Sequence, residues 1–450
     1  MPPRKTAKFK FIDLFAGIGG FHHALAQLGG ECVLAADLDA NCRKVYRATW
    51  PKHPDEALIG DIRSLTRNPD GSERTIGEIA ALVPDHDVIC AGFPCQPFSK
   101  SGMQKGVLDQ TRGTLFFDIM EIAKAKTPRY IILENVRNLA GPRHTDTFAT
   151  IIASLRECGY RVDGDPVVFS PHLLSPAKGG SPQHRERVFI LAEYIGERST
   201  DKTLDVGIRH EPSPGWDPKS WTLDGILQSD QEIDNIENYR LTAEDKAALD
   251  AWQAFVQGIP DDYLPGFPIW VDFFHSKPRY PSDAPQWKRD FIKKNCDFYT
   301  NHKTFIDTWL GLSWKSGESF RVEDFIASRR KFEWQARDVQ PKKEDRDLWK
   351  LAIHFRPSGV RVKAPNYLPT LVAITQTPYI GARRRYLTPV EAGRLQGFPD
   401  TVFPNAEIDD KHAYRQAGNA VNVGVVKYVA AALFEATNAP WLQRRSHNAS

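Results

Sequence analysis

The sequence of 450 residues lacks several features that would place it in other classes of protein. It contains no apolar run of the 18 or so residues that a membrane-spanning helix needs, and its start, MPPRKTAKFK, lacks the apolar core of a signal peptide. Its six cysteines follow no regular spacing, which argues for a reducing compartment. Because neither CxxC nor HExxH occurs, we expect no protein-bound metal.

The overall charge of the chain decides little about its partners. Lysine and arginine number 59 against 56 aspartates and glutamates, which leaves a formal net charge of +3. Hydrophobic residues make up 41% and charged residues 26%, and these proportions are typical of a soluble globular enzyme. The length suits either one large domain or two of ordinary size.

Short apolar runs alternate with helical patterns through the first 195 residues. The strand candidates are FKFIDLFAG, CVLAADL, HDVICAGFP, RYIILENV and RVFILAEY, and helical spacing marks GTLFFDIMEIAKAK and HTDTFATIIASLREC. This strict alternation predicts an α/β fold with a mostly parallel sheet covered on both faces. Ligands of such folds bind at the carboxyl ends of the strands, which is where the unusual residues of this chain fall.

The pattern changes between residues 196 and 364. This part holds nine of the eleven tryptophans, and residues 277–346 carry 16 Lys/Arg against 11 Asp/Glu. Regular patterning returns after residue 365, where NAVNVGVVKYVAAALFEATN predicts a long helix that packs back on the first part. We therefore predict four segments: 9–195 and 365–436 form one domain, 196–364 a second, and 437–450 a flexible tail.

The stretch AGFPCQPFS places a cysteine between prolines at the end of a predicted strand. Cys90 suits the role of a small buried hydrophobe. Cys95 does not, because Pro94 and Pro97 stiffen the backbone around it and keep it out of a regular ladder. A rigid loop that presents a thiol indicates a nucleophile.

The glycine-rich turn FAGIGGF follows the first predicted strand. Gly17 and Gly19 let the backbone turn sharply and approach a ligand, although a tight turn without a ligand explains the motif equally well. A dinucleotide fingerprint would need a third glycine at position 22, where this chain has His22. A nucleoside without a pyrophosphate therefore fits better than NAD, and S-adenosylmethionine is such a ligand.

Acidic residues follow the next two predicted strands. Asp37 and Asp39 favour a ligand at the glycine-rich turn, because an acidic residue there can hold a ribose diol. Asp61 follows a third short strand candidate and could accept a hydrogen bond from an adenine amino group. As a single residue it could equally cap a helix.

Two charged motifs end and open the later strands. A carboxylate such as Glu134 in ENV is commonly solvated or caps a helix, but in a closed pocket its pKa should rise and it could protonate a substrate. Arg185 and Arg187 in QHRER should share one strand face by the period-two rule. Such pairs are more often structural, yet beside a nucleophile we favour a functional role for Arg187.

Six signatures of this chain occur in the order and character of the motifs of DNA (cytosine-5) methyltransferases. They are FAGIGGF, GFPCQPFS, ENV, QHRER, RYLTPVEAGRLQGFP and QAGNAVNV. The chain therefore resembles this family, in its bacterial modification-enzyme type, over roughly residues 9–195 and 365–436. The resemblance implies an S-adenosylmethionine-dependent methyltransferase sheet, an inserted target-recognition domain at 196–364, S-adenosyl-L-methionine as cofactor and double-stranded DNA as partner.

The resemblance also implies roles for single residues. Cys95 would add to carbon 6 of a cytosine flipped out of the duplex, Glu134 would contact its pairing edge, and Arg187, next to Arg185, would bind its ring carbonyl oxygen. The residues expected to line the cofactor site are Phe15, Gly17, Gly19, Asp37, Asp61, Pro94 and Asn419. The residues expected on the loop that closes on DNA are Gln96, Ser99 and Ser101.

Three other interpretations stay open on the sequence alone. An RNA cytosine methyltransferase shares the motifs, although its recognition region is generally compact, whereas here about 170 residues are available. A catalytically silent DNA-binding relative is disfavoured by the intact motifs, and a nicotinamide oxidoreductase by His22. We expect a monomeric cytoplasmic protein, associated with the bacterial nucleoid through DNA and not with a membrane. The sequence leaves open the target site and whether a restriction endonuclease accompanies the enzyme.

Overall fold

The computed structural model describes residues 7–94, 115–196, 203–260, 264–316, 318–371 and 377–443. The chain divides into two compact units. The first comprises Met1–Trp221, Pro369–Ile374 and Pro389–Ser450, and the second comprises Thr222–Leu368 and Thr375–Thr388. The second unit thus begins later in the sequence than the boundary that composition suggested at residue 196, and it also takes in a short stretch after residue 365.

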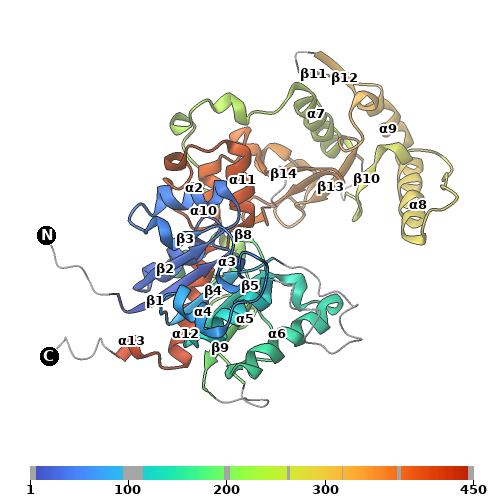
Figure 1. The fold of residues 1–450 in the computed structure, drawn as a ribbon. Coiled ribbons are helices and arrows are strands. Elements are labelled where there is room, and N and C mark those ends of the chain that lie inside the picture. Colours follow the sequence, from blue (N-terminus) through green and yellow to red (C-terminus); the bar gives the residue numbers. More distant parts are fainter. Residues whose placement is uncertain are drawn as a thin grey trace. The chain divides into compact units, whose positions relative to one another are not determined.

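The first unit is built on one large sheet, whose strands are coloured blue to green in Figure 1. Its strand order is β3-β2-β1-β4-β5-β9-β6, with β7 also paired to β9. The five predicted strands are confirmed, with the observed bounds β1 (Phe9–Leu14), β2 (Gly30–Ala36), β4 (Val88–Gly92), β5 (Tyr130–Val136) and β9 (Arg187–Tyr194). The shorter strands are β3 (Leu58–Ile59), β6 (Tyr160–Val162) and β7 (Val167–Phe169).

The predicted mostly parallel sheet is confirmed, but the strict alternation of strand and helix ends after β5. Strands β3, β2, β1, β4 and β5 pair in parallel, whereas β9 runs antiparallel to β5 and to β6. Helix α6 (Thr145–Glu157) connects β5 to β6, and these two strands are not neighbours in the sheet because one strand position lies between them. Strand β9 then lies between β5 and β6 and runs antiparallel to both.

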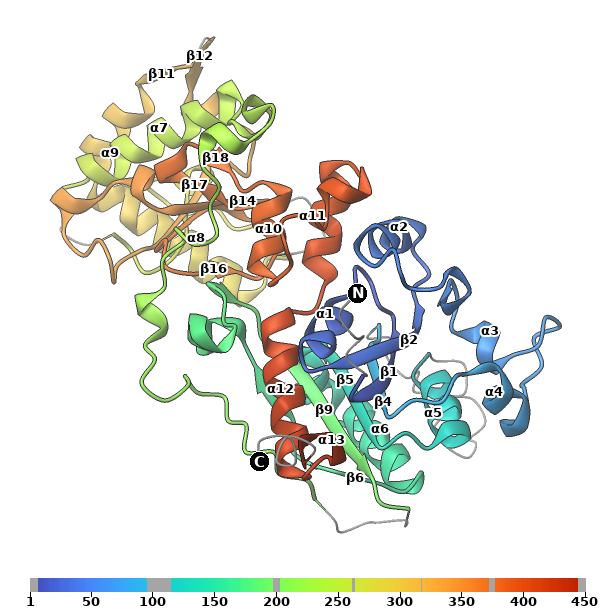
Figure 2. The ribbon, with the colours of Figure 1, turned by 90° about the vertical axis from the view of Figure 1, so that its left-hand side faces the viewer.

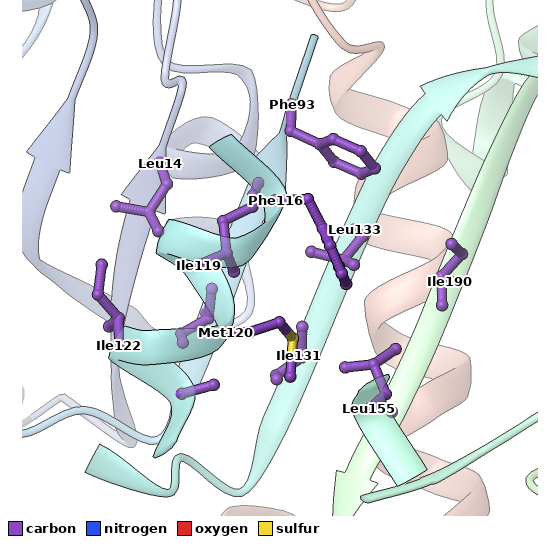
Figure 3. Packing of buried hydrophobic residues seen from close by; sticks show 14 of the residues in the cluster. Leu14, Phe93, Phe116, Ile119, Met120, Ile122, Ile131, Leu133, Leu155 and Ile190 are labelled. Carbon is purple, nitrogen blue, oxygen red and sulfur yellow. The ribbon is translucent and has the colours of Figure 1, made fainter. Parts of the chain in front are cut away.

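Helices cover both faces of this sheet because its strands are apolar on both sides. In β1, Ile12 and Leu14 belong to a core shared with α5 (Leu115–Lys126) and α6. Figure 3 shows Phe116, Ile119 and Met120 of α5 packed against Ile131 and Leu133 of β5. Two short helices, α3 (Arg63–Thr66) and α4 (Ile76–Leu82), add to this layer.

The opposite face of the sheet is covered by α1 (Gly20–Gln27) and by α12 (Val423–Ala436), which lies beside α1 in Figure 2. The long helix predicted near the C-terminus is therefore confirmed. Phe9 stacks on Trp441 of α13 (Pro440–Gln443) with ring centroids 4.7 Å apart. Thr437 contacts the Tyr130 hydroxyl at 2.7 Å. Residues 437–443, which we expected in a flexible tail, thus complete the core, because an aromatic side chain there covers β1.

The remaining helices of the first unit lie before and after the second unit in sequence. They are α2 (Ala40–Thr49), α10 (Pro389–Leu395) and α11 (Asp410–Asn419). One described stretch, Asp410–Ala436, is long and apolar enough to cross a membrane, but 67% of its most apolar window is buried inside the protein. That burial is what the core helices α11 and α12 of a globular unit require.

The second unit has its own sheet, of order β10-β13-β15-β14-β17-β18, and its own apolar core. Trp252 of α7 stacks on Phe332 at 4.7 Å, and Trp309 and Trp334 are also buried. Of the nine tryptophans at 196–364, Trp287 alone is largely exposed, and the others are buried or partly buried. The elements are β10 (Ile269–Trp270), β13 (Lys331–Gln335), β14 (Ala352–Arg356), β15 (Gly359–Lys363), β17 (Tyr379–Ile380), β18 (Arg385–Tyr386), β11 (Ser313–Ser316), β12 (Glu318–Arg321), α7 (Ala243–Gly258), α8 (Gln286–Asn301) and α9 (Lys303–Leu310).

Replacing Gly424 by alanine should destabilise the first unit. A Cβ atom at this position in α12 would lie 1.7 Å from the backbone oxygen of Gly179, so the two segments would have to separate. Overpacking of this kind typically costs about 1–3 kcal/mol. In the matched control Gly77→Ala in α4, no atom lies within 4 Å of the new Cβ, and helix propensity favours alanine by about 0.5–1 kcal/mol. Thermal unfolding should show a lower Tm for Gly424→Ala alone. Equal Tm values for the two variants would contradict the packing.

Candidate active site

The predicted site residues gather at the carboxyl ends of adjacent strands. Leu14 of β1 pairs with Ala36 of β2 and with Ala91 of β4, so the turns that follow these strands leave the sheet at one edge. Gly92 of β4 pairs in turn with Glu134 of β5. This register brings the glycine-rich turn, the acidic residues after β2 and the ENV motif to one end of the sheet.

The glycine-rich turn after β1 has the backbone conformation that its sequence predicts. Phe15, Gly17 and Gly19 have φ angles of 58°, 56° and 87°, in the left-handed region that favours glycine. The N–H of Gly17 donates to Oδ2 of Asp37 at 2.8 Å. No atom lies within 4 Å of the place where a Cβ of Gly17 would stand, so the turn faces open space. This opening is what a bound nucleoside requires.

His22 stands where a dinucleotide fingerprint has its third glycine, and its side chain is buried in α1, the helix that follows this turn. Its ring stacks on Trp50 at a centroid distance of 3.6 Å, and its Nδ1 lies 2.6 Å from the Tyr46 hydroxyl. Burial, together with the charges of His53 and His23, lowers the pKa of His22 to about 3. The imidazole is therefore neutral and packs against Trp50 and Tyr46. A pyrophosphate would need a glycine at this position for its close approach to the backbone, and His22 stands there instead.

Asp37 after β2 is held in place by the backbone. Its Oδ1 accepts from the N–H of Asp39, and burial raises its pKa although the hydrogen bonds from Asp39 and Gly17 oppose the shift. Asp39 itself caps α2 by accepting from the N–H of Asn41 at 2.8 Å. Leu38 between the two carboxylates is 71% exposed, so an apolar side chain stands beside the acceptor. The sequence analysis missed Leu38, although an apolar residue between two acidic ones at a strand end is a readable signal.

Asp61 binds the start of α3. Its Oδ1 accepts from the N–H of Arg63, the first residue of that helix, and the Arg63 guanidinium binds its carboxylate at 2.6 Å. The hydrogen bond from Arg63 lowers the pKa of Asp61. Asp61 lies close after β3, whose neighbour in the sheet is β2. The carboxylate is thus engaged at the start of α3, and the adenine contact stays a prediction.

Glu134 and Arg187 form the charged centre of the site. Oε1 of Glu134 lies 3.0 Å from Nε of Arg187, and both side chains are largely buried. The register of β5 against β9 places Arg187 opposite Val136, two residues after Glu134. Burial raises the pKa of Glu134, while the positive charges of Arg187 and Arg185 oppose the shift. A carboxyl group with a raised pKa beside a fixed arginine is suited to donate a hydrogen bond or a proton.

Asn135 ties this centre to the end of β4. Its side-chain amide donates to the carbonyl oxygen of Phe93 at 2.9 Å, and its Oδ1 accepts from the N–H of Val136. The backbone two residues before Cys95 is therefore fixed to β5. Pro94 is exposed at the last described position before a gap. The predicted residues Cys95, Gln96, Ser99 and Ser101 lie outside the described residues.

Arg185 does not share a strand face with Arg187, as the period-two rule predicted. Strand β9 begins at Arg187, and Arg185 lies before it with a fully buried side chain. Its guanidinium donates to the carbonyl oxygens of Gly418, Ala420 and Leu371. Arg185 thereby fixes the turn around Asn419, which is exposed at the end of α11. In this structure it holds the backbone beside a predicted cofactor residue, and its positive charge also opposes the rise in the pKa of Glu134.

Asp13 is a buried carboxyl group that the sequence analysis did not single out. It lies in β1 with no exposed surface, and its Oδ2 accepts from the N–H of His22. Its Oδ1 has no hydrogen-bond partner in the described part of the chain. Burial raises the pKa of Asp13 to about 8, opposed by the hydrogen bond from His22. A carboxylate among the apolar residues at the end of this strand, after Phe11 and Ile12, is the signal that could have identified it.

Within the described ranges, no group of three or more histidine, cysteine, aspartate or glutamate side chains could hold a metal ion. The polar groups at the site are instead backbone N–H and guanidinium donors and carboxylate acceptors. These suit an organic cofactor and a heterocyclic substrate.

Comparison with known proteins agrees with this geometry. The family model of C-5 cytosine-specific DNA methylases matches residues 9–435. The type II methyltransferase M.AluI of Cellulosimicrobium cellulans is 37% identical over 502 residues, which cover 95% of this chain and 92% of the relative. The type II methyltransferase M.HhaI of Haemophilus parahaemolyticus is 26% identical over 430 residues, covering 95% and 94%. A solved putative DNA modification methyltransferase from an E. coli prophage is 19% identical with a TM-score of 0.49, covering 95% of this chain and 99% of that one.

Replacing Asp13 by asparagine should stabilise the protein, and by more at higher pH. The pKa of Asp13 in the folded protein, about 8, lies above the value of 3.8 for the unfolded chain. Between these values the folded protein binds more protons, so this group makes the free energy of unfolding fall as the pH rises, by at most about 1.4 kcal/mol per unit. The loss is complete above about pH 8. Asparagine removes this slope and still offers an oxygen to His22.

Urea unfolding of the variant and the wild type at two pH values, near 5 and near 8, measures this effect. Buried histidines add a slope of opposite sign below about pH 6.5, but they are common to both proteins and cancel in the comparison. The same difference in unfolding free energy at both pH values would show that Asp13 does not titrate in this range.

Proposed function

Because the chain belongs to the C-5 cytosine-specific DNA methylases, we propose that it methylates carbon 5 of a cytosine flipped out of double-stranded DNA, through a covalent adduct with Cys95. It is a DNA (cytosine-5) methyltransferase, and S-adenosyl-L-methionine is the cofactor of its family. The observation that carries the proposal is the buried pair of Glu134 and Arg187, at the strand ends next to the start of the Cys95 loop.

The chemistry proposed for the base follows from the weakness of cytosine carbon 5 as a nucleophile. The Cys95 thiolate adds to carbon 6, and the ring then holds an enamine whose carbon 5 can take a methyl group. Loss of the carbon 5 proton and elimination of Cys95 restore the aromatic ring and the free enzyme. The base must leave the duplex to reach Cys95, which costs a few kcal/mol of unstacking.

Glu134 and Arg187 divide the recognition of the ring between them. Glu134, whose pKa burial raises, would contact the pairing edge and stabilise the charge that develops there when the thiolate adds. Arg187 would bind the ring carbonyl oxygen while keeping its contact of 3.0 Å with Glu134. Arg185 would act at a distance, by fixing the backbone on either side of Asn419.

The cofactor site is proposed at the turn after β1. S-adenosyl-L-methionine supplies the methyl group when it is bound. The open space at Gly17 lets the protein backbone approach such a nucleoside. The fixed carboxylate of Asp37 suits its ribose, and the exposed side chain of Leu38 suits its adenine ring. Phe15, Gly19, Asp61, Pro94 and Asn419 complete the residues that we assign to it.

We assign sequence selection to residues 196–364 and chemistry to 9–195 and 365–436. The recognisable motifs lie outside this middle part of the sequence, which carries a basic surplus at 277–346. It supplies most of the second unit, whose own sheet and core also take in β17 and β18. Basic side chains on phosphates give affinity, and contacts with base edges add discrimination. The relatives M.AluI and M.HhaI are named type II methyltransferases. We accordingly place this chain in a restriction–modification system, as a cytoplasmic monomer on nucleoid DNA.

Replacing Cys95 by serine should abolish turnover and leave cofactor binding unchanged, because a hydroxyl group is far harder to ionise than a thiol. DNA that contains 5-fluorocytosine at the target should trap the wild type as a covalent complex, since fluorine cannot leave as a proton does. Denaturing gel electrophoresis and mass spectrometry of the complex locate the attachment. An active enzyme that is not trapped, or is trapped at another residue, would remove Cys95 from this role.

Replacing Glu134 by glutamine keeps the size of the side chain but removes its acid. The single-turnover rate of methylation should fall by roughly 10²–10⁴, the usual range for general acid–base catalysis, and DNA affinity should change little. Glu121→Gln, which neutralises a surface carboxylate paired with Lys124, is the matched control and should keep the wild-type rate. Rates for Glu134→Gln within a few-fold of the control would mean that Glu134 does not act as an acid.

A further inference from the structure

Glu186, which lies between the two arginines of the QHRER motif, binds groups from two other segments of the first unit. Its Oε2 accepts from the guanidinium of Arg137 at 2.5 Å. Its Oε1 lies 3.1 Å from Nε2 of His210. The Glu186 side chain is only 13% exposed, whereas Arg137 is 62% exposed. A mostly buried carboxylate that joins separate segments is not an ordinary surface charge.

Glu186 lies directly before β9, at the end of the ladder that pairs β9 with β5. Val136 and Arg187 form the last pair of the antiparallel ladder between β5 and β9. Arg137 follows Val136 and Glu186 precedes Arg187, so both residues lie just beyond this last pair. Their ion pair therefore joins the two segments where backbone pairing ends. Arg187 also donates to the carbonyl oxygen of Glu186 at 2.8 Å. The backbone of Glu186 therefore helps to direct the Arg187 guanidinium.

Electrostatics keeps Glu186 charged in this position. Burial alone would raise its pKa, but the hydrogen bond and the charge of Arg137, with smaller contributions from His184 and His210, lower it below the ordinary value. The ionised form is the one that holds Arg137. The closing pair is thus intact throughout the neutral pH range.

We propose that Glu186 is a positioning residue for the target cytosine: by clamping Arg137 it holds the ends of β5 and β9 together and so keeps Arg187 on Glu134. The inference rests on the function proposed above. Glu134 and Arg187 lie within the last three residues at these strand ends, where the ladder would otherwise fray. A misplacement of about 1 Å in such a pair can cost as much as 10²-fold in rate.

Glu193 at the other end of β9 provides a matched control. It pairs in register with Tyr130, the first residue of β5. Like Glu186 it is a buried carboxylate with cationic partners from neighbouring segments, namely Arg129 at 3.2 Å and Arg161 at 2.5 Å. Neutralising it removes the same kind of interaction from the same pair of strands, but far from Glu134. Any effect that reflects strand stability alone should appear in both variants.

The test compares Glu186→Gln, Glu193→Gln and Arg137→Gln in the full-length enzyme. We expect single-turnover methylation by Glu186→Gln to slow about tenfold, with less than twofold change in the KM values for DNA and S-adenosyl-L-methionine. Glu193→Gln should lower the Tm by at least as much and keep a rate within twofold of the wild type. Because Glu186 acts through Arg137, the double variant Glu186→Gln/Arg137→Gln should be no slower than either single variant. If Glu186→Gln does not fold, Arg137→Gln, which alters the exposed partner, carries the same comparison.

The outcomes separate this inference from the proposed function. Equal rates for the Glu186 and Glu193 variants would overturn the positioning role, and so would additive losses in the double variant. A rise in KM without a loss of rate would overturn it as well, since it would place Glu186 in binding. A wild type that methylates no DNA would instead contradict the proposed function.

Discussion

The antiparallel return of β9 beside β5 is the constraint on which the candidate site depends. Glu134 lies near the end of β5, which pairs in parallel with β4, whereas Arg187 enters the sheet from the opposite direction as the first residue of β9. This lets the first residue of one strand meet the end of its neighbour, so that Arg187 reaches Glu134 at 3.0 Å. A parallel strand in the same place would present its last residues to Glu134 instead. The ion pair is buried, which makes its geometry costly to disturb.

A second layer of contacts ties the rest of the site to this pair. Asn135 fixes the end of β4 through the Phe93 carbonyl, and Arg185 fixes the turn at Asn419 through two carbonyl oxygens. Each of these residues satisfies backbone groups that would otherwise be unpaired near the site. The end of β4 and the backbone on either side of Asn419 are thus held by side chains from the same motifs that carry the charged centre.

The sequence predicted the strands of the first unit because buried parallel strands appear as continuous apolar runs. It could not predict the direction of β9, since an apolar run carries no direction and β6 and β7 are only three residues each. The prediction that Arg185 and Arg187 share a strand face was wrong for a related reason. The alternation of side chains holds only inside a strand, and β9 starts at Arg187. Glu186 was missed because a glutamate between arginines looks like a solvated charge until its partners Arg137 and His210 are known.

Bisulfite sequencing of DNA from cells that express this chain tests the central claim most directly, because it reads the modified base, its position and its sequence context together. We predict that cytosines in one short sequence context resist conversion, and that the same sites convert fully in cells carrying the empty vector. Complete conversion in the presence of folded protein would contradict the assignment of this site to cytosine-5 methylation, and protection scattered without a common context would contradict the assignment of sequence selection to residues 196–364.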